Sequence, residues 1–263
     1  MLECVINVSE GRDQGIIDAL TIAAGADLLD VHSDPHHHRS VLTVVGEAAA
    51  QAVAAATVAG VDLRAHRGAH PRIGALDVVP FVPLGEATLA DAVAARDRFC
   101  RWAAEALDLP CFAYGPERSL PEVRRSAFVT LPPTIGPAEA HLSAGAVAVG
   151  ARPVLVAYNV WLAEADVDLA RRVATEVRGP GIRALGLLVG DRAQVSMNLV
   201  DPFAVGPAAA ADAVASLAPI AGCELVGLVP RAVLDAAPSS RWAALDLAED
   251  RTIEARLAAQ SGR

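Results

Sequence analysis

The stretch RAHRGAHPRIGALDVVPF, residues 64–81, joins a loop of basic side chains to the strand that follows it. Ionisable side chains crowd together in the loop, and the glycine and proline among them exclude a continuous helix. The apolar residues at the end of the stretch predict a strand over residues 75–82. Imidazole and guanidinium groups suit an anionic substrate whose proton is moved near neutral pH, because histidine titrates there. The alternative is a solvated basic turn that leads into a buried strand.

Upstream of this strand, the first half of the chain follows the order β-α-β-β-α-β. Strands are predicted where apolar residues alternate or run together, and helices where they recur every three to four residues. The elements before the strand are a strand at residues 3–8, a helix at 11–24, strands at 27–31 and 39–46, and a helix at 47–58.

The second half of the chain repeats the same order. Its predicted elements are a strand at residues 153–161, a helix at 166–177, strands at 182–189 and 194–200, a helix at 207–217 and a strand at 223–229. This order is the split βαβ arrangement of ferredoxin-like folds. The sequence therefore predicts an α/β (α+β) protein with two ferredoxin-like β-α-β-β-α-β lobes and a cleft between them, where ligands commonly bind.

The segments outside the repeated pattern complete the predicted organisation. Residues 88–107 favour a helix and residues 110–114 a brief strand, whereas proline, arginine and serine in residues 115–137 indicate a connection. Residues 241–259 are typical of a charged amphipathic helix. The predicted domains are an N-terminal lobe with its connecting segment at 1–135, a C-terminal lobe at 136–238 and a helical tail at 239–263.

The composition excludes several classes of function. Of the 263 residues 53% are hydrophobic and 20% are charged, which indicates a globular chain. A net charge of −9 argues against a nucleic-acid partner, and the apolar runs are too short or interrupted for a membrane span. The chain has no lysine, so chemistry that requires a lysine amine is excluded, while arginine favours carboxylate substrates. Four widely spaced cysteines and the absence of a signal peptide predict a cytoplasmic protein.

A histidine run, DVHSDPHHHRS at residues 30–40, invites a second interpretation. His36 and His38 can share one metal ion, with His32 or Asp34 as a further ligand. Adjacent side chains on an extended strand face opposite ways, which limits how many of the histidines can converge. The alternative is a polar loop.

Four stretches carry a resemblance to a known family. ECVINVSEGRD, HRGAHPRIGALDVVPF, AQVSMNLVD and ELVGLVP resemble segments of the formiminotransferase domain found in glutamate formiminotransferase and formiminotransferase-cyclodeaminase. The similarity runs from residue 3 to about residue 237, and HPRIGALDVVPF is its most specific block. The resemblance implies a transferase of histidine degradation and one-carbon metabolism that moves a formimino group from N-formiminoglutamate to N5 of tetrahydrofolate. It also implies two α/β lobes, small-molecule partners and association of the domain, and we expect a homodimer.

The resemblance also implies roles for particular residues. His70 stands where the family has its catalytic histidine, and an imidazole can both take the proton from N5 and pass one to the departing glutamate nitrogen. Arg39 matches the family's arginine and is expected to hold a carboxylate, while Asp77 either tunes the histidine or only bonds nearby backbone. The full set of expected substrate-binding residues is Asn7, Ser9, Glu10, Arg12, Arg39, Arg64, His66, Arg67, Arg72 and Asp77.

Tetrahydrofolate is the co-substrate that the resemblance implies, and no metal is expected. The family's folate-binding segment matches here at Gly136, Pro137, Ser143 and Gly145. Residues 138–142 and 144 depart from the family's serines and aromatic residues, and His141 among them is expected to donate a hydrogen bond to folate. Two alternatives stay open. One is a metal-assisted hydrolase of an amidine or amide that uses His32, His36 and His38. The other is a non-catalytic module that binds folate or a carboxylate.

Overall fold

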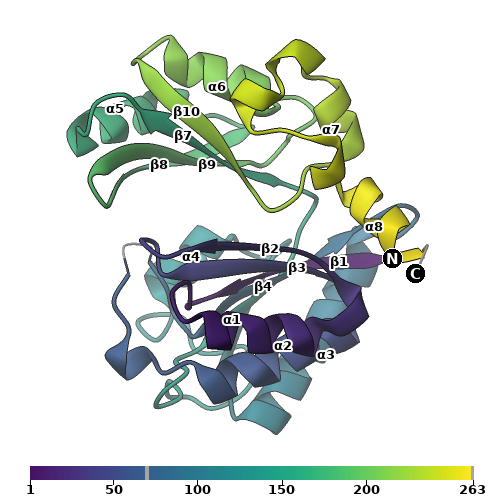
Figure 1. Ribbon diagram of the computed structural model, residues 1–263. Coiled ribbons are helices and arrows are strands. Elements are labelled where there is room, and N and C mark those ends of the chain that lie inside the picture. Colours follow the sequence, from purple (N-terminus) through teal and green to yellow (C-terminus); the bar gives the residue numbers. More distant parts are fainter. Residues whose placement is uncertain (69–70, 262–263) are drawn as a thin grey trace. The chain divides into compact units, whose positions relative to one another are not determined.

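A computed structural model describes residues 1–68 and 71–261, and the chain forms two compact units, Met1–Pro153 and Val154–Arg263. Each unit has its own sheet, helices and hydrophobic core (Figure 1), so the α/β class predicted from the sequence is confirmed. Residues 136–153, which were predicted to lie in the second lobe, fall within the first of these compact units. Within the described part of the chain, no helix has both the length and the apolar character needed to cross a membrane.

The sheet of the first unit has six strands in the order β2-β3-β1-β4-β6-β5. The strands are β1 (Leu2–Val8), β2 (Leu28–Asp34), β3 (Arg39–Val45), β4 (Leu76–Pro83), β5 (Cys111–Tyr114) and β6 (Val147–Ala151). The first four pair antiparallel, whereas β6 lies parallel to both β4 and β5. The end of β1 therefore lies beside the beginnings of β3 and β4.

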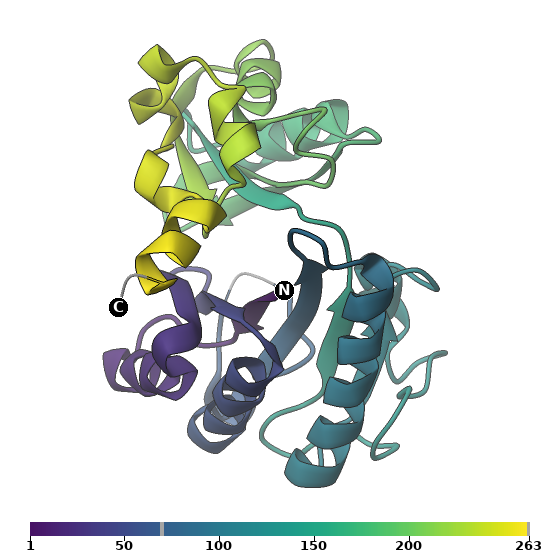
Figure 2. The same cartoon turned by 90° about the vertical axis from the view of Figure 1, so that its right-hand side faces the viewer.

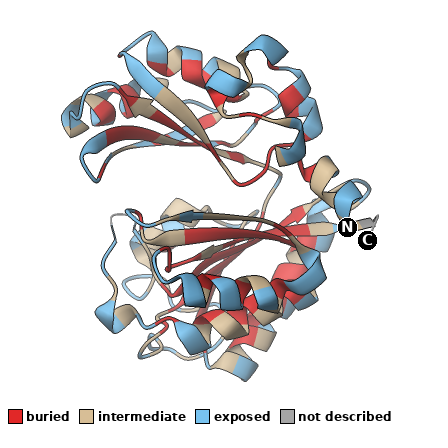
Figure 3. Ribbon diagram, in the orientation of Figure 1, coloured by how far each residue is buried: buried red, intermediate tan, exposed pale blue. Residues whose placement is uncertain are grey.

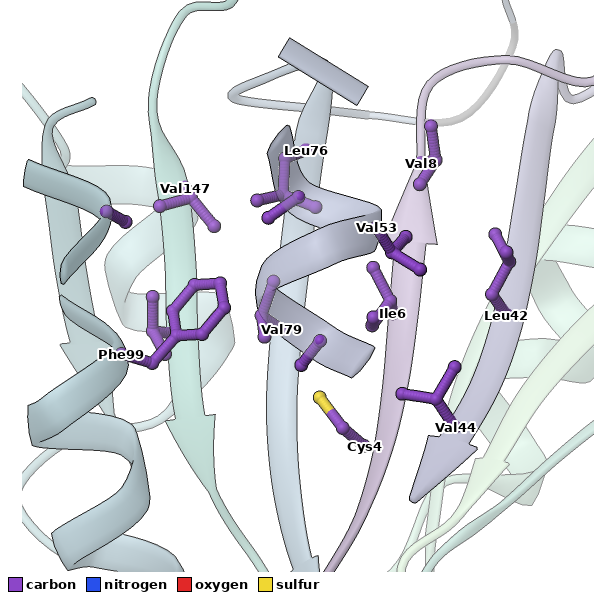
Figure 4. Close-up of a cluster of buried hydrophobic side chains, with 14 of the residues drawn as sticks. Cys4, Ile6, Val8, Leu42, Val44, Val53, Leu76, Val79, Phe99 and Val147 are labelled. Atoms are coloured by element: carbon purple, nitrogen blue, oxygen red, sulfur yellow. The ribbon is translucent and has the colours of Figure 1, made fainter. Parts of the chain in front are cut away.

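Three helices cover one face of this sheet (Figure 1 and Figure 2): α1 (Gln14–Ala24), α2 (Glu47–Gly60) and α3 (Leu89–Leu107). The core between helices and sheet is made of small and medium apolar side chains around Ile6, Val53, Val79 and Phe99 (Figure 4). The helix surfaces turned away from the sheet are largely exposed (Figure 3). A second cluster that includes Val123 lies where α4 (Leu120–Ser126) packs on β5 and β6.

The first helix begins later than the sequence predicted. It starts at Gln14 because the carboxylate of Asp13 caps it, accepting hydrogen bonds from the backbone N–H groups of Gly15 and Ile16. Residues 11–13, which were predicted to be helical, instead donate their N–H groups to the carboxylate of Glu10. Helix α4 and strand β6 were not predicted at all.

The second unit has a four-stranded antiparallel sheet in the order β10-β7-β9-β8. Helices α5 and α6 pack on this sheet, and the buried apolar side chains between them and the sheet form the core of the unit. The elements are β7 (Val156–Leu162), α5 (Val167–Val177), β8 (Ile182–Val189), β9 (Arg192–Leu199), α6 (Pro207–Ala215) and β10 (Ile220–Val226).

The tail is not the single helix predicted over residues 241–259. It forms α7 (Arg231–Asp235), three 3₁₀ turns (Ser239–Arg241, Ala243–Leu245 and Glu249–Arg251) and α8 (Ile253–Ser261). Asp246 interrupts the helix, because its backbone is left-handed at φ 55° and its carboxylate accepts a hydrogen bond from the backbone of Leu225 in β10. Leu245 and Leu247 on either side are buried in the core of the second unit, so this part of the tail belongs to the fold.

Candidate active site

Polar side chains gather at one end of the first sheet, where β1 ends and β3 and β4 begin. Asn7 is near the end of β1, Arg39 opens β3 and Asp77 lies next to the first residue of β4. The antiparallel pairing of β1 with both neighbours brings the three residues together, although they are far apart in sequence. Three of the residues expected to bind substrate are thus in one place.

Asp77 is the centre of this group and is fully buried. Its carboxylate accepts hydrogen bonds from Nη1 of Arg39 at 2.9 Å and from the backbone N–H of Ile73 at 2.8 Å. Nη2 of Arg124 lies 2.7 Å from the same oxygen that Arg39 contacts. Arg39 also donates from Nε and Nη2 to Oδ1 of Asn7, at 3.0 and 2.7 Å. Both guanidinium groups are therefore fixed by a carboxylate below the surface of the protein.

The charges in this cluster control its ionisation. Burial alone would raise the pKa of Asp77, but the nearby charges of Arg39 and Arg124 and the hydrogen bonds to the carboxylate bring its pKa below the ordinary value. Burial lowers the pKa of Arg39, an effect that Asp77 opposes. One carboxylate faces two arginines, so the cluster has an excess of positive charge and suits an anionic ligand.

Arg124 is the residue of this cluster that was not predicted from the sequence. It lies on α4, inside the stretch that was predicted to be a connection. A signal for this helix exists in the sequence: Ser119 and Glu122 form a capping box, the S-x-x-E pattern that marks a helix start. Arg124 also donates from Nη1 to the backbone oxygen of Pro71, which ties α4 to the basic loop.

The loop after β1 contains the remaining residues expected on this side of the site. Ser9 is buried and donates from Oγ to the backbone oxygen of Gly74 at 2.8 Å. Oε1 of Glu10 accepts three backbone N–H groups at 2.7–3.0 Å, and these hydrogen bonds, with nearby His38, overcome the effect of burial and lower the pKa of Glu10. Arg12 is exposed and donates from Nε to the backbone oxygen of Pro35. Ser9 and Glu10 thus organise the loop, whereas Arg12 lies at its surface.

Two histidines stack between this loop and the basic loop. The rings of His38 and His66 have centroids 3.9 Å apart, and Nη1 of Arg72 lies 2.8 Å from Nε2 of His66. Arg72 also donates to the backbone oxygens of His37 and His38, at 3.1 and 3.2 Å. Burial first, and then the charge of Arg72, lower the pKa of His66 to about 4. Burial also lowers the pKa of His38, although Glu10 opposes the effect. Both rings are thus neutral near pH 7.

The other basic residues of the loop point elsewhere. Arg64 is exposed and pairs with Asp62 at 2.6 Å, and Arg67 donates to the backbone oxygen of His66. His70, the expected catalytic residue, lies outside the described residues. Of the described residues that flank it, Gly68 approaches the backbone of His37 and Pro71 accepts the hydrogen bond from Arg124.

The segment expected to bind folate lies against the beginning of β4, within the first unit. The backbone N–H of Ala75 donates to Ala144, that of Leu63 donates to Ser143, and Gly74 and Gly145 form an antiparallel bridge. Nδ1 of His141 accepts hydrogen bonds from the backbone of Ser143 and Ala144, so this side chain holds the turn.

Gly136 and Gly145 both have positive φ, at 100° and 70°. A Cβ at Gly145 would lie 2.4 Å from the backbone oxygen of Ile73, so only glycine fits there. Gly136 stands against the backbone of Leu109 and Pro110 at the entry to β5, where Pro137 follows it.

The histidine run does not converge on a metal-like arrangement in the described part of the chain. His38 turns toward Glu10 and His66, and the exposed His36 and the buried His37 donate their backbone N–H groups to Asp34. Among residues 1–68 and 71–261, no group of three or more histidine, cysteine, aspartate or glutamate side chains is placed to hold a metal ion.

Comparison with known proteins gives a consistent result. Residues 1–152, almost the same span as the first unit, match the family described as "Formiminotransferase domain, N-terminal subdomain". The chain is 39% identical to a glutamate formimidoyltransferase of Streptococcus pyogenes over 76% of its own length and 78% of that protein. It is 33% identical to a glutamate formimidoyltransferase of Thermoplasma acidophilum over 76% of its length and 77% of that protein. It is also 35% identical to the formimidoyltransferase-cyclodeaminase of Rattus norvegicus, over 90% of its own length but only 52% of that longer protein.

An α/β unit with a buried arginine–carboxylate cluster, together with these relatives, defines a group-transfer enzyme. More specifically, the chain belongs to the formiminotransferase family.

Proposed function

We propose that the protein transfers the formimino group of N-formiminoglutamate to N5 of tetrahydrofolate and releases glutamate. The observation that carries the proposal is the match to a glutamate formimidoyltransferase across most of both chains. The arginine–carboxylate cluster supports it independently, because the donor is a dicarboxylate and needs fixed positive charge.

In the proposed donor site, Arg39 holds a carboxylate of the donor. Asp77 and Asn7 already fix its guanidinium, so little side-chain freedom is lost when substrate binds. Arg124 and Arg72 add positive charge nearby. Arg64 and Arg67 are exposed, and we propose for them a weaker, long-range attraction of the anionic substrates.

His70 is the proposed general acid and base. N5 attacks the amidinium carbon and loses its proton to the imidazole, and the tetrahedral intermediate then expels the glutamate nitrogen, which takes up a proton. The proton balance closes, because one proton leaves N5 and one arrives on the departing amine. The donor and acceptor must be held together for this step, which converts it into a reaction within one complex.

Tetrahydrofolate is the proposed acceptor and binds along the segment that contains Gly136, Pro137, His141, Ser143 and Gly145. The hydrogen bonds from Leu63 and Ala75 to this segment support a place for the acceptor beside the donor site. A ferredoxin-like topology for the two lobes is also part of the proposal. In each sheet the first strand of the repeated β-α-β-β-α-β pattern lies between the third and the fourth strands of that pattern, and this shared antiparallel order supports the topology. A homodimer and a cytoplasmic location stay predictions.

The experiment that tests the function is turnover of N-formiminoglutamate with tetrahydrofolate by purified protein, with and without a chelator. We expect 5-formiminotetrahydrofolate and glutamate in equal amounts, unaffected by the chelator, and a loss of at least about 100-fold in kcat for His70→Ala. Activity lost to the chelator and restored by zinc would favour the metal-assisted hydrolase instead. Folate binding without turnover would favour the binding module.

A further inference from the structure

Strand β8 lies at one edge of the sheet in the second unit and lacks several features that usually protect such an edge (Figure 1). Its eight residues pair with β9 in an unbroken register, so no bulge bends the strand away from a further neighbour. It contains no proline and only one charged residue, Arg183, although proline and charge are common means of blocking edge pairing. Leu185 and Leu188 are each 46% exposed, so the strand also presents apolar side chains to solvent.

The hydrogen bonds of β8 show which of its residues face outward. In an antiparallel ladder the N–H and C=O groups of one residue point to the same side, and the side alternates along the strand. The backbone oxygen of Gly181 accepts from the N–H of Val200, which directly follows β9, so the odd-numbered residues of β8 face β9. Ile182 instead exchanges two hydrogen bonds with Gly179, at 3.1 and 3.2 Å, so the even-numbered residues face outward.

The fold covers only the first half of this outer side. Beyond Ile182, the backbone oxygen of Ala184 accepts a hydrogen bond from Nε of Arg178 at 2.9 Å. The N–H and C=O groups of Gly186 and Leu188 also face outward, and no partner reaches them within the described part of the chain. These four groups form an open edge to which one further strand can bind.

We propose that the open edge binds β8 of a second copy of the chain, in a symmetric antiparallel pair with its two-fold axis at Leu187. In this register Gly186 of each copy is paired with Leu188 of the other, and the two pairs form four backbone hydrogen bonds. Every open N–H and C=O group of the edge is then satisfied. Leu188 stands opposite a residue without a side chain, and Leu185 and Leu187 are covered on the other face of the sheet.

The charges at the two ends of the paired segment identify a second copy as the occupant. In the proposed register Arg183 of each copy lies beside Asp191 of the other, and the symmetry makes this contact twice. Both side chains are exposed, and neither has an ion-pair partner within residues 1–68 and 71–261. Moving the axis by one residue in either direction separates the two charges, because Arg183 then lies opposite Val189 or beyond the turn that joins β8 to β9. An unrelated extended peptide would use the backbone groups but would not supply the matched charges.

The association is independent of the proposed reaction. The resemblance led us to expect a homodimer without naming a surface, and the edge of β8 supplies one. The pairing joins two four-stranded sheets into one continuous sheet and removes an exposed edge from each copy.

Sedimentation equilibrium of the full chain over a concentration series tests the association, and we expect the parent to dimerise. Arg183→Asp and Asp191→Arg each place like charges side by side at two symmetric positions, so each should raise the dissociation constant at least about 10-fold. Asp191 is not among the described residues with positive φ, so arginine fits the turn. The variant with both changes restores opposite charges, and its dissociation constant should lie within about threefold of that of the parent.

Leu188→Pro tests the backbone hydrogen bonds. The N–H of Leu188 faces outward, so proline removes one donor from the open edge and leaves the pairing with β9 intact, as edge strands allow. We expect this variant to be monomeric across the series, with a thermal midpoint close to that of the parent. Leu217→Ala is the control, because this leucine is also 46% exposed and lies outside the edge, and the variant should dimerise like the parent.

A parent that stays monomeric over the whole series would overturn the proposal. Dimers that persist in both single charge variants would place the interface elsewhere and overturn it as well. Dimers lost in the single variants and not recovered in the double variant would contradict the register, and with it the argument for a second copy of β8. If Leu188→Pro does not fold, the charge variants, which change only exposed side chains, still decide between these outcomes.

Discussion

Nη2 of Arg124 lies 2.7 Å from Oδ2 of Asp77, and the two residues come from α4 and from the second position of β4. Nη1 of Arg39, at the beginning of β3, lies 2.9 Å from the same oxygen. One buried carboxylate therefore joins two strands and a helix that covers the opposite edge of the sheet. The stability of the first unit and the charge of its site depend on the same residue.

Replacing Asp77 with asparagine should destabilise the protein strongly. The change removes the carboxylate shared by two guanidinium groups, and breaking a buried ion pair from one side typically costs about 3–5 kcal/mol. We expect urea denaturation to show that the free energy of unfolding of the variant is lower than that of the parent by this amount. Asp168→Asn is the control, because its pair with Arg171 is exposed and should cost less than about 1 kcal/mol. Equal effects in the two variants would contradict the role given to Asp77.

Replacing Arg124 with alanine tests the residue that the sequence did not reveal. The variant loses a charge-assisted hydrogen bond to Asp77 and one of the positive charges that act on Arg39, so the donor should bind more weakly. We expect KM for N-formiminoglutamate to rise about 10- to 100-fold, which corresponds to about 1.5–3 kcal/mol for a hydrogen bond to a charged group. KM for tetrahydrofolate should change less. Arg125→Ala, a change at the exposed neighbour, should leave both constants unaltered.

The regular elements were predictable because their signals are local. Apolar residues alternate along β1 and β8 and recur helically along α5, so periodicity found these elements to within a few residues. Strand β6 was missed because its short apolar run shows no period that tells a strand from a buried turn, and its parallel partners are distant in sequence. The tail was misread because one left-handed residue, Asp246, ends a helical pattern without changing the apolar spacing.

The site was predictable only in part. Asn7, Arg39 and Asp77 were all expected from the resemblance, and the structure brings these three together. Arg124 was missed because a seven-residue helix rich in arginine resembles a connection, although its capping box was visible. The pairing of Glu10 with His38 depends on a left-handed backbone and on three backbone N–H groups, and neither leaves a signal in the sequence. The role of His70 stays a prediction.

Replacing Gly145 with alanine should disturb the segment that we propose to bind folate. A Cβ there would lie 2.4 Å from the backbone oxygen of Ile73, and the positive φ of 70° adds strain. We expect a loss of about 1–3 kcal/mol in the free energy of unfolding, and a KM for tetrahydrofolate that rises more than that for the donor. Gly179→Ala, where the Cβ meets open space, should change stability by less than about 0.5 kcal/mol. A selective effect on the donor would contradict the assignment of this segment.

The stability of the protein should fall as the pH decreases from about 6.5 toward 4. In the unfolded chain a histidine has a pKa of about 6.5, whereas in the folded protein the pKa of His66 is about 4 and that of His38 is also lowered. Within this window the unfolded state binds protons that the folded state does not, so acidification favours unfolding. Glu10 and Asp77 have lowered pKa values, so their stabilising contribution persists through most of this window and is lost only at more acidic pH.

The measurement is the free energy of unfolding at pH 7.5 and at pH 5 for the parent and for a variant with His38→Asn and His66→Asn together. We expect the parent to lose more stability between the two pH values than the variant, because the variant lacks both groups with lowered pKa. Exposed His36 provides the control, since His36→Asn should lose as much stability as the parent. Parallel losses in the parent and the double variant would mean that the stacked pair does not resist protonation in the folded state, and that neither ring is held neutral by its surroundings.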